Sequence, residues 1–476
     1  MRPKPETPTR GTLLGTSAYI FLIRLLPTLA SVGALVWLAR HLPPATYGRY
    51  QRFWVQWQVL HVVACLGLPT LVLTYAPALL AGLVRATRPR HVAWLGGWVL
   101  LLACGLAGLQ GGVGAPFAPW QAGAFLLLNV PVAILEAYGL VQRQFWAVAL
   151  VSAAYAGVFG LSHALLVSQL LTSEQLMACL LAGTALRLAA LRLLARQHPP
   201  QASPAAPVAW RTVRSLWAHT ALNELVQVLF RWADKFVLNF WLPAALFALY
   251  FNGTLDVPFL PLLLGAAGST LLLHFGQPYL TDAGRLSTLR AVATLLGRLV
   301  FPLFFFLIFF RYELFGVVFA HRYDAAVPLF VLSSLVVPLR AYNFTALLQH
   351  KGQGRIISTG AVLDLLLALA LLYPLYQWLG LAGVALAFVV STYCQAGYYL
   401  GHTARLLRVP WASLLPWRPW ATQALGAGLG VGLLHLGLVA VLAERATLLV
   451  GAGLLGLWLA GQVWQARRIE LKEVVE

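Results

Sequence analysis

Residues 357–376 read ISTGAVLDLLLALALLYPLY, and residues 381–401 read LAGVALAFVVSTYCQAGYYLG. Each run has about 20 residues, which is the length of helix that crosses the hydrocarbon core of a bilayer. Asp364 is the one charged residue in the two runs. Because a backbone in lipid must satisfy its own hydrogen bonds, each run is predicted to form a membrane-spanning helix.

Apolar runs of the same kind recur along the whole chain, separated by short polar segments. They predict an all-α polytopic membrane protein with about 14 transmembrane helices and no soluble domain of any size. The predicted spans are 14–38, 53–80, 92–110, 121–141, 147–168, 175–194, 216–241, 249–273, 291–310, 325–348, 357–376, 381–401, 422–442 and 447–465.

The composition of the chain supports a protein embedded in lipid. Its 476 residues are 60% hydrophobic and 10% charged, whereas a soluble domain carries roughly 25% charged residues. The net charge of +19 does not indicate nucleic-acid binding here, because the basic residues lie in short loops rather than on one face. The cysteines lie inside apolar runs without metal-ligand spacing: Cys65, Cys104, Cys179 and Cys394.

The basic residues predict the orientation of the spans by the positive-inside rule. With the N-terminus in the cytoplasm, both termini are cytoplasmic, and the predicted location is the bacterial cytoplasmic membrane. The cytoplasmic segments then carry Arg2, Lys4, Arg10, Arg85, Arg88, Arg90, Arg143, Arg196, Arg211, Arg214, Arg285, Arg290, Lys351, Arg355, Arg405, Arg408, Arg418, Arg467, Arg468 and Lys472. The opposite segments carry only Arg40, Arg49, Arg52, Arg311, Arg322 and Arg445.

Two pairs of segments indicate an internal duplication. LPPATYGRY at 42–50 resembles LPAALFALY at 242–250, and LAGTAL at 181–186 resembles LAGVAL at 381–386. Both pairs are offset by 200 residues, or six spans, so the copies would be parallel and related by an axis along the membrane normal, with the substrate between two lobes. The predicted division is an N-terminal lobe at 1–194, a cytoplasmic linker at 195–215, a C-terminal lobe at 216–401, and spans 13 and 14 with a cytoplasmic tail at 402–476.

Several motifs in order along the chain resemble one transporter family. They are LARHLPPATYG at 38–48, RWADKFVL at 231–238, LFG at 314–316, LLQHKGQ at 347–353 and WLGLAGVAL at 378–386. Together they resemble the polysaccharide or O-antigen flippases of the multidrug/oligosaccharidyl-lipid/polysaccharide exporter superfamily. The resemblance covers most of the chain, although each motif alone is mostly Gly, Pro and apolar residues.

The resemblance implies two six-helix lobes around an inverted-V cavity. It implies transport of an undecaprenyl-diphosphate-linked oligosaccharide from the inner to the outer leaflet, by alternating access and coupled to H⁺ or Na⁺. The expected partners are this lipid-linked substrate, membrane lipids and the polysaccharide polymerase machinery. No cofactor is expected.

The seventh span is the richest in polar residues inside the membrane. Glu224, Gln227, Arg231 and Asp234 recur at i, i+3, i+7 and i+10, which is one helical face. Asn223 and Lys235 flank this stripe. We interpret the stripe as the lining of a hydrated cavity; the alternative is that its charges neutralise each other as packing pairs.

Fixed positive charge inside the spans would suit a diphosphate, because the arginine guanidinium offers a bidentate fork. Arg24 is the preferred ligand, with Thr28 and Ser31 on the same face of the first span; the alternative is that Arg24 reaches the interface. Arg231 and Arg340 are further candidates, and Asn343 lies about one turn after Arg340.

Acidic residues inside the spans are candidates for binding the coupling ion, and a structural hydrogen bond between helices is the alternative for each of them. Besides Glu224 and Asp234, they are Glu136, Asp256 and Asp364.

Other functions fit the sequence less well. The chain carries no P-loop, G-x-S-x-G or H-E-x-x-H motif, so we predict that it is not an enzyme. A multidrug or toxin exporter and a peptidoglycan-precursor flippase of the same superfamily remain alternatives. A membrane-embedded glycosyltransferase or O-antigen ligase is the alternative of another class, but the predicted non-cytoplasmic loops are all short.

Overall fold

The computed structural model describes residues 28–74, 87–114, 116–197, 210–255, 268, 271–272, 274–276 and 280–473 of the chain. Every regular element in these residues is a helix, so the predicted all-α class is confirmed. The chain divides into two compact units, Met1–Ala248 and Leu249–Glu476, and each is described by itself.

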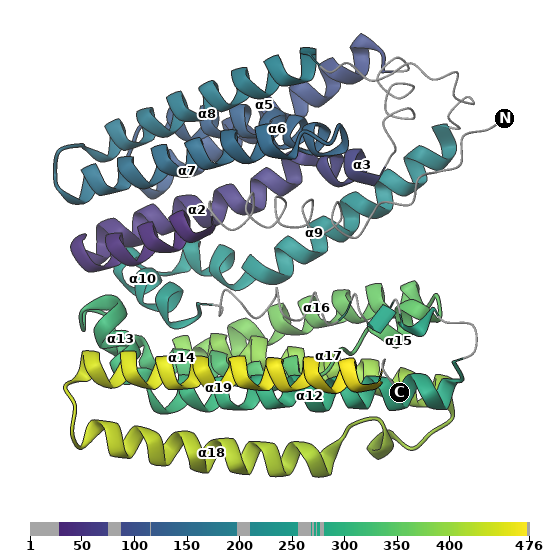
Figure 1. The fold of residues 1–476 in the computed structure, drawn as a ribbon. Helices are drawn as coiled ribbons and strands as arrows, with labels where there is room; N and C mark the ends of the chain where they lie inside the picture. Colours follow the sequence, from purple (N-terminus) through teal and green to yellow (C-terminus); the bar gives the residue numbers. More distant parts are fainter. Residues whose placement is uncertain are drawn as a thin grey trace. The chain divides into compact units, whose positions relative to one another are not determined.

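The first unit is a bundle of long helices (Figure 1). A helix at 28–41 is followed by α2 (Pro44–Cys65), α3 (Leu68–Thr74), α5 (Pro89–Val113), α6 (Pro119–Val141), α7 (Phe145–Val167), α8 (Ser173–Gln197) and α9 (Trp210–Trp241). Helix α10 (Ala244–Gly253) crosses the boundary between the units. Within the bundle, α6 packs on both α5 and α8, and α9 packs on α2 and α3.

The predicted span at 53–80 is a bent pair of helices rather than one straight helix. Helices α2 and α3 meet at an angle of 51°. At the bend, Leu66 and Gly67 have φ values of +49° and +68°, which end the regular α-helical path. The Trp217 indole on α9 donates a hydrogen bond of 2.6 Å to the freed Leu66 carbonyl, so the bend is fixed from the neighbouring helix.

Helix α9 therefore packs within the first compact unit, although the predicted linker precedes it. The six-and-six division of the spans rests on sequence repetition and stays a prediction.

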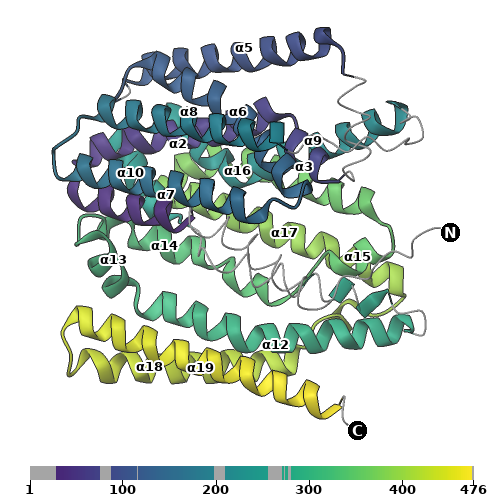
Figure 2. The same ribbon diagram turned by 45° about the horizontal axis from the view of Figure 1, so that its top comes forward.

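The second unit contains two helix hairpins and a set of short helices. Its elements are α12 (Asp282–Phe309), α13 (Arg311–Phe319), η1 (Asp324–Ala326), α14 (Val327–Ser334), η2 (Val337–Ala341), α15 (Ala346–His350), α16 (Gly354–Leu379), α17 (Leu381–Leu407), η3 (Trp411–Ser413), α18 (Trp417–Val439) and α19 (Glu444–Glu473). Helices α16 and α17 pack closely along their length, and α18 and α19 lie beside α12 (Figure 2).

Among the described residues, nine helices are long and apolar enough to cross a membrane, or ten if α2 and α3 count as one span. One of the nine is Asp324–Ala341, in which η1, α14 and η2 follow one another, and α15 comes after a break, so the predicted span at 325–348 is irregular rather than one straight helix. Exposed leucines along α18 are typical of a lipid-facing surface. These are Leu425, Leu429, Leu433 and Leu436, each 67% or 68% exposed.

Candidate functional site

An ion pair joins α6 and α8 inside the first unit. The Arg187 guanidinium donates a charge-assisted hydrogen bond to the Glu136 carboxylate, and both side chains are largely buried. The Ser152 hydroxyl lies 3.5 Å from the other carboxylate oxygen, and the Tyr155 ring lies 5.0 Å from the guanidinium carbon. Glu136, a predicted ion-coupling candidate, is therefore neutralised by a cation that the sequence analysis did not select.

A signal for Arg187 was present in the sequence, since it lies deep in the predicted span at 175–194. What the sequence lacked was the packing of α8 against α6, which brings together two residues 51 positions apart.

The polar stripe on α9 divides between two environments. Asn223, Gln227 and Arg231 are exposed. Glu224 is half-buried and accepts a hydrogen bond from the Thr70 hydroxyl of α3. The exposed face of α9 therefore carries two amide side chains and the Arg231 guanidinium. Glu224, by contrast, is hydrogen-bonded to a neighbouring helix.

Asp234 and Lys235 at the end of the stripe are buried and form an ion pair of 3.3 Å. This is the packing pair that the alternative interpretation of the stripe describes. Lys235 also lies 5.8 Å from the ring centroid of Trp232, so its charge is balanced by more than the carboxylate of Asp234.

The candidates on the first predicted span fall partly outside the described residues. Thr28 and Ser31 lie exposed on the helix at 28–41. Arg24 lies outside the described residues, as does Asp256 of the eighth predicted span.

Asp364 on α16 stands apart from the other acids. Its side chain is buried, with 2% exposure, and among the described residues no hydrogen bond of 3.5 Å or less reaches either carboxylate oxygen. Ser391 on α17 and, through its charge, Arg340 act on this carboxyl. A buried carboxylate without a salt bridge is costly, so the position needs a reason other than packing.

Arg340 is exposed on η2, and the chain turns directly after it. Tyr342 is extended, with φ −132° and ψ 138°, so Arg340 and Asn343 do not share the helical turn that the sequence predicts. Asn343 instead accepts a hydrogen bond of 2.9 Å from the Ala346 amide at the start of α15. Asn343 therefore stabilises the start of α15. Arg340 remains exposed.

Within the described ranges, no three His, Cys, Asp or Glu side chains are grouped closely enough to hold a metal ion. The described residues thus provide two neutralised acids in the first unit, Glu136 and Asp234, a buried acid without a salt bridge in the second, Asp364, and accessible arginines on α9 and η2.

Neither the family models nor the curated proteins match this chain. Among solved structures, the fold is similar to the lipid II flippase MurJ in an inward closed conformation, with a TM-score of 0.65 and 13% identity over 97% of this chain and 100% of that one. It is also similar to an inward-facing multidrug resistance MATE family transporter of the MOP superfamily, with a TM-score of 0.55 and 13% identity over 83% and 98% of the two chains. The chain therefore has the multi-pass helical fold of these two transporters.

Proposed function

We propose that this protein is a flippase that moves an undecaprenyl-diphosphate-linked oligosaccharide from the inner to the outer leaflet of the bacterial cytoplasmic membrane. The observation that carries the proposal is the fold, which is similar to a lipid II flippase over 97% of the chain. The family motifs quoted above favour an oligosaccharide of polysaccharide biosynthesis as the cargo. The protein would work by alternating access, without a cofactor, and would pass its cargo to the polymerase machinery.

Accessible arginines support an anionic cargo. Arg231 and Arg340 are exposed although they lie on apolar helical segments. A guanidinium is always charged and binds phosphate oxygens through two parallel hydrogen bonds. We therefore assign these two residues, together with Arg24, to the diphosphate, and the exposed Asn223 and Gln227 to polar contacts beside it.

Asp364 is the favoured site for the coupling ion. A buried carboxyl without a salt bridge can take up H⁺ or Na⁺ without first breaking an ion pair, whereas Glu136 and Asp234 would each have to release a cation. Because the charged form is costly in a buried setting, loading of Asp364 would depend on its access to water. That dependence is what couples an ion gradient to a conformational cycle.

The test is transport in proteoliposomes that contain a fluorescent undecaprenyl-diphosphate-linked oligosaccharide, with and without an imposed H⁺ or Na⁺ gradient. The unaltered protein should move the lipid, and Arg24→Ala, Arg231→Ala and Arg340→Ala should reduce its rate by tenfold or more. Replacement by Lys should restore part of the rate, since charge returns but the fork geometry does not. Arg405→Ala is the control, because Arg405 is exposed in the last turn of α17.

The variant Asp364→Asn keeps the shape of the side chain and removes its titration. It should still bind the lipid but lose the effect of the gradient on the rate. A gradient effect of unchanged size in Asp364→Asn would refute the assignment of this residue and leave the flippase proposal standing.

A multidrug exporter is the second candidate, because the fold is also similar to a MATE family transporter. It predicts the export of cationic dyes by the same proteoliposomes, with no movement of the lipid-linked sugar. That result would replace the flippase proposal and leave the arginines with structural roles.

A further inference from the structure

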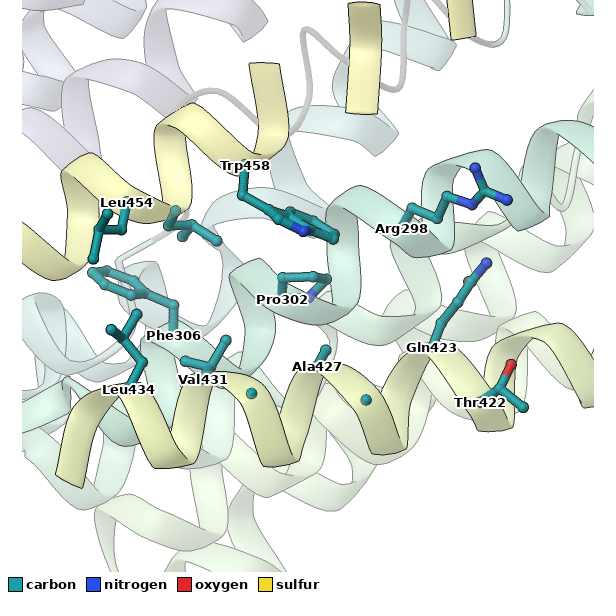
Figure 3. Close-up of a pocket in the computed structure, with 13 residues that line it drawn as sticks. Arg298, Pro302, Phe306, Thr422, Gln423, Ala427, Val431, Leu434, Leu454 and Trp458 are labelled. Carbon is teal, nitrogen blue, oxygen red and sulfur yellow. The ribbon is translucent and has the colours of Figure 1, made fainter. Parts of the chain in front are cut away.

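The second unit contains a cavity of about 510 Å³ lined by α12, α18 and α19 (Figure 3). Cavities of roughly 300–1,000 Å³ are typical of small-molecule sites. Its lining is polar at one end, where Arg298, Thr422 and Gln423 lie, and apolar at the other, around Phe306 and Leu434. The cavity thus has the polarity of an amphiphile.

The polar end is held in place by contacts between α12 and α18. The Gln423 amide donates a hydrogen bond of 3.1 Å to the Thr294 carbonyl, and Gly297 leaves room for this side chain. Arg298, one position later on α12, is exposed and makes no hydrogen bond or ion pair with any residue that the structure describes. Its guanidinium is therefore available at the mouth of the cavity.

The length of the cavity matches one leaflet of a bilayer. Thr422, Gly426, Gly430 and Leu434 line it at intervals of four residues along α18. At 1.5 Å per residue, these positions span about 18 Å, and half of the hydrocarbon core is about 15 Å. A single acyl chain of ordinary length fits this distance, whereas a polyprenyl chain is far longer.

The charge around the polar end favours an anion. Arg285 and Arg290 precede Arg298 on α12, and Arg418 lies at the start of α18. Asp282 is already paired with Arg285 at 2.9 Å and with Lys351 at 2.7 Å. This end is the one that the positive-inside rule places in the cytoplasm, where the leaflet is anionic and basic pockets between helices bind lipid headgroups.

We propose that this cavity binds an anionic diacyl phospholipid of the inner leaflet, with its phosphate on Arg298 and one acyl chain along α18. The lipid would fill the space between α12 and the C-terminal helix pair α18–α19. It would stabilise the attachment of that pair, and it would be a resident lipid rather than the transported cargo.

The test uses the purified full-length protein, delipidated in mild detergent. Bound phosphatidylglycerol is counted by native mass spectrometry, and the melting temperature is followed as phosphatidylglycerol or phosphatidylethanolamine is added. The unaltered protein should retain one phosphatidylglycerol and melt at a higher temperature with it than with phosphatidylethanolamine. Arg298→Gln should weaken phosphatidylglycerol binding at least tenfold, since one charge-assisted contact is lost.

A variant that fills the cavity tests the acyl-chain part of the proposal. Gly430→Leu should abolish lipid retention without disturbing the fold, because a Cβ at Gly430 meets no atom within 4 Å and the exposed helix face leaves the longer side chain the cavity to occupy. Gly437→Leu is the matched control, because it lies exposed on the same helix, has the same open surroundings and does not line the cavity. This control should bind phosphatidylglycerol as the unaltered protein does.

Unchanged retention in both Arg298→Gln and Gly430→Leu would overturn the proposal. Displacement of phosphatidylglycerol by undecaprenyl phosphate would also overturn it, because the cavity would then hold the cargo's lipid tail. If Gly430→Leu fails to fold, the phosphatidylglycerol retention of Arg298→Gln is compared with that of Gly437→Leu. Equal retention in these two variants would overturn the proposal. None of these results depends on transport, so they are separate from the test of the flippase proposal.

Discussion

Arg187 and Glu136 are charged side chains in an apolar bundle, and each is stable there only because the other is present. The pair is largely buried, with side-chain exposures of 14% and 21%. Removal of one partner leaves the other charge without compensation, whereas removal of both leaves neutral groups. The two charges are therefore tolerated as a pair, and the loss of either one alone should cost more stability than the loss of both.

This asymmetry predicts the order of stability of three variants. Arg187→Gln alone should lower the free energy of unfolding by about 3 kcal/mol, because the Glu136 carboxylate remains buried. The double variant Arg187→Gln with Glu136→Gln should be more stable than Arg187→Gln. Melting temperatures in one detergent would measure this order, and a double variant that is less stable than the single one would contradict it.

The sequence alone could single out candidate site residues by their position in an apolar run. It could not predict which side chains they contact. Asp364 stands out because it is the one charge in a long apolar run. The exposure of Arg340 and the capping role of Asn343 depend on where η2 ends. A pattern of helical spacing cannot locate that end, because Arg340 and Asn343 would share a face in any uninterrupted helix.

At the scale of elements, small residues set how closely neighbouring helices approach. Gly383 near the start of α17 faces the Leu375 carbonyl of α16, and a Cβ at this position would collide with that backbone oxygen. Gly183, the equivalent residue of the repeat, faces the Val158 side chain at 2.9 Å from a Cβ. The two glycines thus permit close packing in each unit, against partners of different rigidity.

The difference predicts unequal costs for the same substitution. Gly383→Ala should destabilise the protein by about 2 kcal/mol, because backbone must move and overpacking costs in that range. Gly183→Ala should cost less, since only the Val158 methyl group and not backbone must shift, and alanine improves helix propensity by about 1 kcal/mol. Thermal unfolding of the two variants measures both, and equal melting temperatures would show that the α16–α17 contact is not tight.

His321, in the turn after α13, links η1 to the start of α19 outside the predicted membrane spans. Its ring nitrogens lie 3.0 Å from the Asp324 carboxylate and 2.9 Å from that of Glu444. The hydrogen bond with Asp324, and then that with Glu444, raise the pKa of His321. The stabilising contribution of the protonated ring is therefore complete below the ordinary histidine pKa of about 6.5 and is lost as the pH rises through the higher folded value.

The variant His321→Asn tests this linkage without straining the backbone. The φ of His321 is +61°, a conformation that asparagine tolerates better than most residues. The melting temperature should fall by more at about pH 5.5 than at alkaline pH above the raised folded pKa, where the charged link is lost. Glu444→Gln should reduce the same pH dependence. A difference between the unaltered protein and His321→Asn that does not vary with pH would rule out the charged link.

At the scale of the whole molecule, the sequence predicts the class of fold more securely than the course of the individual helices. Long apolar runs can only be helices in lipid, so the all-α fold followed directly. The bend at Gly67 and the short helices between Asp324 and His350 were not predictable. Both receive hydrogen bonds from other helices that the sequence does not reveal: Trp217 of α9 donates to the Leu66 carbonyl, and Tyr393 of α17 donates to the Leu335 carbonyl at the end of α14.

The orientation of the molecule can be tested on α16 alone, because this helix is long enough to cross the bilayer. Gly354 and Trp378 lie at its opposite ends and are both exposed, Trp378 by 82%. They are separated by about 36 Å at 1.5 Å per residue, more than the roughly 30 Å hydrocarbon core. Lys351 and Arg355 flank only the Gly354 end, which the positive-inside rule places in the cytoplasm.

In a variant without the four native cysteines, a membrane-impermeant maleimide should label Trp378→Cys in intact cells. Gly354→Cys should react only after the cells are permeabilised. The reverse pattern would invert the predicted topology, and it would move the Arg298 end of α12 to the outer leaflet, where the charge argument for an inner-leaflet phospholipid no longer holds. The orientation of this one helix therefore decides which leaflet supplies the lipid, because α12 and α16 both begin at segments that the basic residues assign to the same side.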